Sequence, residues 1–142
     1  YSLVEALYEA PFYWMSADKA YRATAMGNRG RFAEAFSADR LQRVFGASRV
    51  HTNVDIYESK GRKLGEVDVL VIFANRAIVL QAKSKRLTLE ARKGNDQVIK
   101  DDFKKSVQDS YDQGRLCASA LTDPGYRFVG ADLPGFFVPL TT

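Results

Sequence analysis

The chain has 142 residues, 46% of them hydrophobic and 27% charged, and its 21 basic and 17 acidic side chains give a formal net charge of +4. This composition excludes a disordered chain, and the length allows one hydrophobic core without a stabilising metal or disulfide. One cysteine and one histidine exclude an intrachain disulfide and a zinc site built from these residue types, so a bound metal would need mainly oxygen ligands.

Two further expectations follow from the sequence as a whole. No apolar run approaches the roughly 18 residues of a membrane span, so we expect a cytoplasmic protein with no membrane partner. The chain starts with Tyr1 and shows no signal segment, so we expect a fragment of a longer protein with a covalently attached neighbouring domain. The mild positive charge is compatible with a polyanionic partner but does not identify one.

The N-terminal part of the chain predicts helices. Residues 1–26 are expected to form a helical and aromatic extension, with short helices at Leu3–Glu9 and Ala17–Met26 separated by Pro11. The remaining residues, 27–142, are expected to form the main domain.

A clearer helix is predicted from Gly30 to Phe45, and Gly46 ends it. At 100° per residue, Leu41 and Phe45 fall almost directly below Glu34, so this carboxylate lies along the apolar stripe of the helix. Such a position favours a functional carboxylate. The alternative is a glutamate at the edge of the stripe that reaches water or pairs with a nearby arginine.

Three strands, a long helix and two short strands are predicted next, from runs of Val and Ile, turn residues and helical spacing of apolar residues. The long helix is interpreted as a crossover, which requires a mixed sheet with helices on both faces. We therefore predict an α/β fold, a three-layer α/β/α sandwich with an αβββαβ core. The predicted strands are Arg49–Tyr57, Glu66–Phe73, Arg76–Ser84, Arg127–Gly130 and Phe136–Val138, and the helix is Asp96–Leu121.

Polar side chains interrupt the apolar pattern of the hairpin formed by the second and third strands. Side chains alternate across a strand, so Glu66 and Asp68 share one face, as do Gln81 and Lys83 on the next strand. If the turn is centred just after Ala74, Asp68 faces Gln81, and if it is centred one residue later, Asp68 faces Lys83. Either register brings the three polar side chains within about 5–8 Å, whereas an odd-length loop scatters them.

This cluster has the composition of a cation site. An acid and an amide oxygen near a backbone carbonyl suit Mg²⁺ or Mn²⁺, and Glu34 is a candidate for a further contact. Lys83 beside such a cation would orient water and neutralise the anionic transition state of phosphodiester hydrolysis. The alternative is a structural one, in which Glu66, Asp68 and Lys83 form salt bridges on a solvated sheet face.

The hairpin also resembles a known active-site signature. Gly65-Glu66-Val67-Asp68, followed after twelve residues by Gln81-Ala82-Lys83, is similar to the motif of the restriction-endonuclease-like PD-(D/E)xK nuclease superfamily, in the Gln-x-Lys variant of Mrr-type restriction endonucleases. Upstream, Gly27-Asn28-Arg29-Gly30 with Glu34 resembles the first core helix of Mrr-type and nuclease-related (NERD) domains. The resemblance covers roughly residues 27–140.

The resemblance implies a role for each matched residue. Asp68 would be the central metal ligand, Lys83 the catalytic lysine, and Gln81 and the Ala82 carbonyl further ligands, with Glu34 assisting from the helix. Many relatives carry a carboxylate in place of Gln81, and a neutral amide there weakens metal binding.

The implied function is a Mg²⁺- or Mn²⁺-dependent endonuclease that hydrolyses DNA, or alternatively RNA, with water as the nucleophile. Two other hypotheses are a catalytically inactive nuclease-fold module that binds nucleic acid and an interaction domain with a buried ion-pair network. Glu66 and Gln108 are secondary site candidates. Gln108 and Gln113 of the long helix could approach the metal side, and the alternative is that both are ordinary surface glutamines. Basic side chains around the site are expected to contact phosphates. These are Arg29, Arg31, Lys60, Arg62, Lys85 and Arg86.

Overall fold

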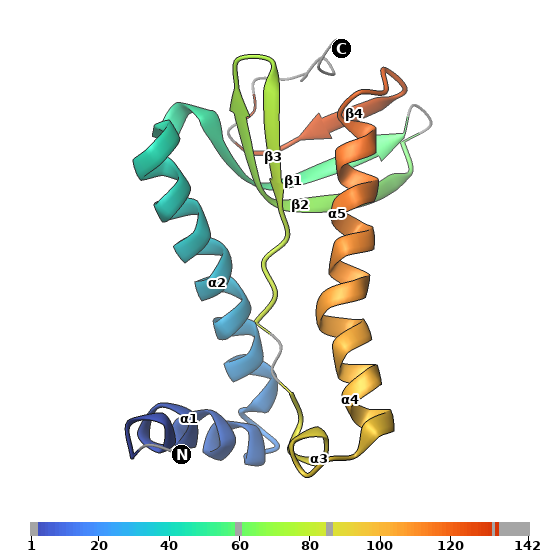
Figure 1. The fold of residues 1–142 in the computed structure, drawn as a ribbon. Helices are drawn as coiled ribbons and strands as arrows, with labels where there is room; N and C mark the ends of the chain where they lie inside the picture. The colour runs from blue at the N-terminus through green and yellow to red at the C-terminus, as the bar shows by residue number, and fades with distance from the viewer. Residues whose placement is uncertain (1–2, 59–60, 85–86, 132, 134–142) are drawn as a thin grey trace.

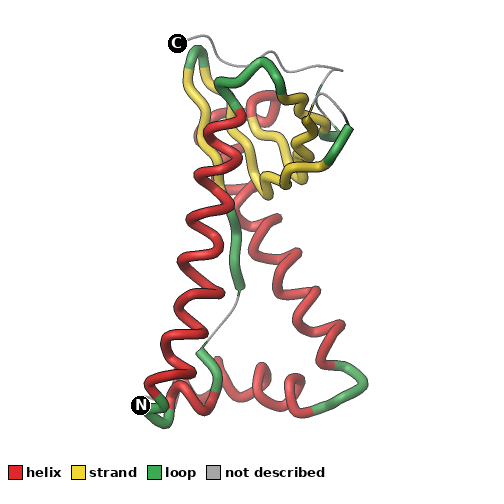
Figure 2. Tube along the Cα trace, turned by 90° about the vertical axis from the view of Figure 1, so that its right-hand side faces the viewer, coloured by secondary structure: helices red, strands yellow, loops and turns green. Residues whose placement is uncertain are grey.

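The computed structural model describes residues 3–58, 61–84, 87–131 and 133. A four-stranded sheet forms one end of the molecule, and two long helical segments extend away from it (Figure 1). The chain that follows β3 runs between these segments, and α1 and α3 lie at the far end, as the rotated view also shows (Figure 2). The elements are α1 (Leu3–Ala17), α2 (Arg22–Phe45), a 3₁₀ turn η1 (Ala47–Arg49), β1 (Val50–Glu58), β2 (Lys63–Phe73), β3 (Arg76–Leu80), α3 (Leu89–Arg92), α4 (Asp96–Phe103), a π-helical turn η2 (Lys104–Gln108), α5 (Asp109–Ala120) and β4 (Tyr126–Val129).

The sheet is antiparallel throughout, in the order β3-β2-β1-β4. The predicted mixed sheet is therefore wrong. A crossover helix would have led to a parallel strand, but the chain after β3 first leads away from the sheet and returns through α4 and α5. A tight turn then follows, in which the Asp123 carboxylate accepts from Gly125 N at 2.8 Å. This turn leads β4 antiparallel to residues 55–58 of β1.

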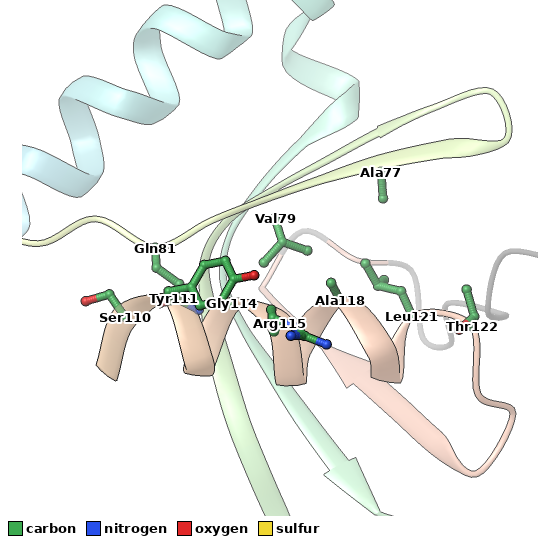
Figure 3. A pocket seen from close by; sticks show the side chains of 10 residues that line it. All are labelled: Ala77, Val79, Gln81, Ser110, Tyr111, Gly114, Arg115, Ala118, Leu121 and Thr122. Atoms are coloured by element: carbon green, nitrogen blue, oxygen red, sulfur yellow. The ribbon is translucent and has the colours of Figure 1, made fainter. Parts of the chain in front are cut away.

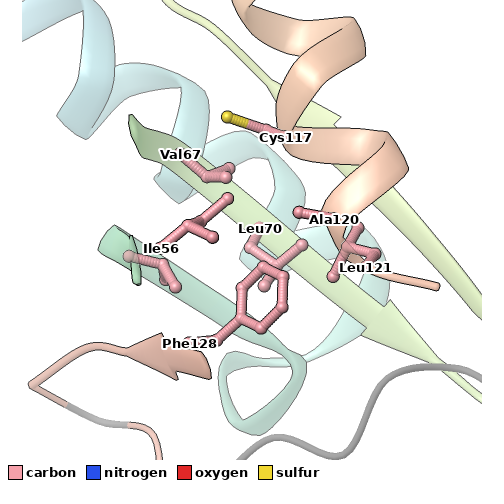
Figure 4. Packing of buried hydrophobic residues seen from close by; sticks show 8 residues of the cluster. Ile56, Val67, Leu70, Cys117, Ala120, Leu121 and Phe128 are labelled. Carbon is pink, nitrogen blue, oxygen red and sulfur yellow. The ribbon is translucent and has the colours of Figure 1, made fainter. Parts of the chain in front are cut away.

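Helices cover both faces of the sheet, which confirms the coarser α/β prediction. On one face, Cys117 and Ala120 of α5 and Leu121, which follows it, form a core with strand residues that include Leu70 and Phe128 (Figure 4). On the other face, α2 packs through Ala38. Burial on both sides explains why residues 67–71 of β2 are all buried, rather than alternating.

The N-terminal helices differ from the prediction. Pro11 lies inside α1 instead of ending a helix before it. Proline in a helix interior costs about 3 kcal/mol, and contacts with α2 help to offset this cost, among them the Arg29 guanidinium 4.1 Å from the centre of the Phe12 ring. α2 starts at Arg22 rather than Gly30, so it crosses the predicted boundary between residues 26 and 27; that division of the chain stays a prediction.

The remaining elements are close to their predicted ranges. α2 ends at Phe45, and Gly46 follows it with a φ of 89°, as expected. The predicted Asp96–Leu121 helix is one helical run with a π-helical turn in its middle. The short α3 was not predicted, and the predicted strand Phe136–Val138 lies outside the described residues. In the part of the chain that the structure describes, no helix is long and apolar enough to cross a membrane.

Candidate functional site

The β2–β3 hairpin fixes the register of the candidate site. Phe73 pairs with Arg76 and Val69 pairs with Leu80, so the turn is centred just after Ala74. This is the first of the two predicted registers. It brings Gln81, the residue after the paired Leu80, level with Asp68.

The strand pairing stops at the site because side chains replace the main-chain partners. Ala82 N donates to Asp68 Oδ2 at 2.7 Å, and Gln81 Nε2 donates to the carbonyl oxygen of Glu66 at 2.7 Å. These two bonds occupy groups that a longer ladder would use. β3 therefore ends at Leu80 and not at the predicted Ser84.

α5 holds the opposite side of the cluster. Gln113 Nε2 donates to the Glu66 carbonyl at 3.3 Å, and the Cys117 thiol lies 3.7 Å from the same oxygen. Lys83 Nζ donates to Gln113 Oε1 at 3.5 Å. Gln113 therefore connects Lys83 to β2. Of the two helical glutamines that the sequence offered for the metal side, Gln113 lies at the cluster, whereas Gln108 bonds to Asp112 within the helix.

Asp68 is an unusually buried carboxylate, with 9% of its surface exposed. Burial raises its pKa above the ordinary value, the hydrogen bond from Ala82 and the charge of Lys83 act in the opposite direction, and the charge of Glu66 raises it further. Burial and the nearby charge of Asp68 also raise the pKa of the Cys117 thiol. The site is thus poorly solvated and would gain from a neutralising cation.

Oxygen atoms without a protein partner remain in this cluster. Gln81 Oε1 is buried and accepts no hydrogen bond, and among the described residues Asp68 Oδ1 accepts none either. Gln81 lines a cavity of about 530 Å³ with Tyr111, Gly114 and Arg115 of α5 (Figure 3). A carboxylate and an amide oxygen left without partners fit a hard cation such as Mg²⁺.

The cluster does not contain a full set of acidic ligands. Within the described ranges, no three His, Cys, Asp or Glu side chains lie close enough together to hold a metal ion. Mg²⁺ is commonly bound by only one or two carboxylates, together with water and substrate phosphate oxygens. The residues present therefore fit a cation that binds together with a phosphate better than one held by the protein alone.

Glu34 lies beside the cluster but is not joined to it. Its carboxylate forms no hydrogen bond or ion pair with any described residue, Asp68 included. It lines a cavity of about 970 Å³ together with Ala82 and Lys83. The structure thus brings Asp68, Gln81, Ala82 and Lys83 together and places Glu34 on a cavity that only the last two share.

The secondary candidates have other partners. The Glu66 carboxylate pairs with Lys63 at 2.9 Å, and Lys63 also pairs with Asp55 at 2.7 Å. The hydrogen bond to Asp55, and to a smaller extent the one to Glu66, raises the pKa of the Lys63 ammonium group. Glu66 thus faces the site through its carbonyl group, not its carboxylate. Gln108 donates to Asp112 at 3.0 Å within the helix.

Three of the six basic side chains that were expected to contact phosphates already bond to protein groups. Arg29 Nη2 donates to the carbonyl of Ser84 at 2.8 Å, which ties α2 to the chain that follows β3. Arg31 donates to Asn28, and Arg62 pairs with Glu58 at 2.6 Å. The other three, Lys60, Lys85 and Arg86, lie outside the described residues.

Comparisons with known proteins do not assign a role to the candidate site. No protein family, curated protein or solved structure matches this chain.

Proposed function

We propose that this chain is a divalent-metal-dependent nuclease domain of the PD-(D/E)xK type, which hydrolyses phosphodiester bonds in DNA. The observation that carries the proposal is the bond from Ala82 N to the buried Asp68 carboxylate. This bond supports the proposal, because it holds an acid against the residue that separates Gln81 and Lys83 in the chain. The unpartnered Gln81 Oε1 gives further support.

Each residue has a chemical role in this proposal. Asp68, Gln81 Oε1 and the Ala82 carbonyl would hold Mg²⁺ or Mn²⁺. The bound cation would supply positive charge at the phosphate and lower the pKa of attacking water. Lys83 would donate to a phosphate oxygen and stabilise the charge that develops as water attacks phosphorus and the P–O bond breaks. Gln113 would orient Lys83 through the hydrogen bond to its ammonium group.

The first test compares DNA cleavage by the wild type, Asp68→Asn and Lys83→Met, each with Mg²⁺ or Mn²⁺. Lys93→Met is the matched control, because this exposed lysine pairs with Glu90 of α3 and lies outside the β2–β3 hairpin. We expect both site variants to lose at least about 100-fold in rate, and the control to cut like the wild type. Cleavage that persists unchanged in both site variants would assign the activity to a contaminant. Wild-type protein that shifts DNA in a gel but never cuts it would replace the nuclease with the binding-module hypothesis.

The second test addresses the role of Gln113. Gln113→Leu keeps the side-chain volume and removes the acceptor for Lys83, while the Glu66 carbonyl keeps the bond from Gln81. We expect kcat to fall about 10-fold with little change in KM, since the lost bond is long and charged. Gln97→Leu is the control, because among the described residues Gln97 bonds only to Asp101, within α4. Equal kcat values for the two variants would remove Gln113 from the proposed site.

A further inference from the structure

A large cavity adjoins the candidate site on the side of α1 and α2. Its volume is about 970 Å³, and its lining includes Ala82 and Lys83, which also belong to the site, together with residues 12–14 of α1. This volume lies at the upper end of the roughly 300–1,000 Å³ range of ligand sites. The cavity has room for one nucleotide, and a ligand inside it would be within the reach of Lys83.

The wall of this cavity is aromatic. Phe12, Tyr13 and Trp14 follow one another in α1 and all line it, with Met26 and Leu87 as apolar neighbours. Trp14 is 73% exposed, so its indole ring is open to a ligand in the cavity. Tyr13 Oη is buried without a hydrogen-bond partner, so it can donate to or accept from a polar ligand edge.

The charges on the lining favour an anionic ligand. Among the described residues of the lining, Arg22, Arg29 and Lys83 are basic and Glu34 alone is acidic. Flat aromatic faces beside positive charge are the combination that binds unpaired nucleotides, in which bases stack on the rings and the backbone contacts the cations. A base inside a double helix cannot enter this cavity, because it is stacked on its neighbours and paired with the other strand.

We infer that this cavity, defined by residues 12–14, Met26, Leu87 and the basic residues above, receives an unpaired base of the nucleic acid. The inference rests on the proposed function, and it specifies the substrate class as a strand with an unpaired nucleotide next to the scissile phosphate. The base stacks on Trp14, because Arg29 and Arg92 already lie over the rings of Phe12 and Tyr13, while Lys83 contacts the adjoining phosphate.

The first experiment uses Trp14, which is the only tryptophan in the chain. Metal-free protein in EDTA is titrated with a short single-stranded oligonucleotide, and the tryptophan fluorescence is recorded. We expect saturable quenching by the single strand. A fully paired duplex of the same sequence, and a strand with abasic sites, should each bind about 10-fold more weakly or worse. Equal binding of the abasic and intact strands, or binding without a fluorescence change, would overturn the inference.

The second experiment measures anisotropy of a labelled single strand with variants. Base stacking on an aromatic side chain contributes about 1–3 kcal/mol, so Trp14→Ala should weaken binding about 10-fold or more. Phe103→Ala, which removes an exposed aromatic side chain of α4 outside the cavity, should leave the affinity unchanged. Unchanged affinity in Trp14→Ala, with its helical circular dichroism intact, would contradict the inference.

The two proposals fail in different ways. Wild-type protein that shows quenching by single strands but cuts no DNA would end the nuclease proposal and keep the base-binding cavity. Protein that cuts DNA yet binds abasic and intact strands equally would end the base-binding inference and keep the nuclease proposal. A change of tryptophan fluorescence on dilution without DNA would show that a second copy of the chain covers the cavity, and would overturn the inference.

Discussion

The buried Asp68 carboxylate makes a prediction about stability that does not depend on activity. Because its pKa is raised in the folded protein above the ordinary aspartate value of 3.8, the folded state holds the proton more tightly than the unfolded state. The resulting stabilisation is fully present below that ordinary value and is lost as the pH rises through the raised pKa. At neutral pH the wild type therefore carries an unfavourable buried charge.

Asp68→Asn removes this charge and keeps an oxygen that accepts from Ala82 N. We expect the variant to unfold at a higher temperature than the wild type at neutral pH. The difference should shrink as the pH is lowered through the raised pKa, because the wild-type carboxyl becomes neutral as well. Thermal unfolding over a pH series checks this. A variant that is less stable than the wild type at every pH would contradict the assigned cause.

Single residues also show what sequence alone could tell about the site. Alternation along β2 and the short turn were enough to group Asp68, Gln81 and Lys83. The same reasoning missed that the Gln81 amide bonds to the main chain of Glu66, because alternation gives the face of a side chain but not its partner. The role of Glu34 stays a prediction, since a helical stripe gives the face of a side chain but not the distance between the helix and a strand end.

At the scale of elements, the β2–β3 turn contains a conformational strain. Ala74 has a φ of 54°, in the left-handed region. This conformation costs an L-residue about 1–2 kcal/mol, whereas glycine loses about 0.5–1 kcal/mol through its greater freedom in the unfolded chain. We therefore expect Ala74→Gly to stabilise the domain by up to about 1 kcal/mol.

Urea unfolding measures this change, and Gly61→Ala is the opposite control. Gly61 has a φ of 82°, and an added Cβ would meet no atom within 4 Å, so only backbone strain acts there. This control should be destabilised. A loss of stability in Ala74→Gly, with Gly61→Ala behaving as expected, would show that the turn at Ala74 is not strained.

Elements were predictable where local chemistry defines them and unpredictable where distant contacts do. Gly46 ended α2, and apolar spacing revealed the α4–α5 run. The end of β3 depends on side chains of β2 and α5, and the direction of β4 depends on the path of the whole connection after β3. Pro11 lies inside α1, contrary to the prediction, because packing of α1 against α2 outweighs the preference of proline for helix ends.

At the scale of the whole molecule, both helical segments hold the chain that carries Ala82 and Lys83. Arg29 of α2 donates to the carbonyl of Ser84 at 2.8 Å, and the main chain of Thr88 donates to Asp102 of α4 at 2.7 Å. The segment leaves the sheet directly after Leu80 and is nevertheless fixed from both sides. The residues of the candidate site are therefore held in place by the fold itself, whereas the unfolded chain does not keep them together.

Because only the folded chain holds the proposed ligands together, we expect a divalent cation to stabilise the folded protein. A ligand that binds only the folded state adds about 2.7 kcal/mol at a hundredfold excess over its Kd. This increment raises the Tm of a domain of this size by several degrees, on the order of 5–10 °C. Thermal unfolding with and without Mn²⁺ measures the shift. Asp68→Asn should lose it, because the substitution weakens the residue that we propose as the central ligand.

Glu34→Gln makes this measurement specific. The Glu34 carboxylate forms no bond to Asp68 and lines only the neighbouring cavity, so the variant should keep the Mn²⁺-induced shift. If Glu34→Gln loses the shift as fully as Asp68→Asn does, α2 must move toward the hairpin when the cation binds, and Glu34 is then a ligand after all. If the wild type shows no shift at any Mn²⁺ concentration, the unpartnered oxygens of Asp68 and Gln81 do not form a cation site in the free protein, and the cation would have to arrive with the phosphate.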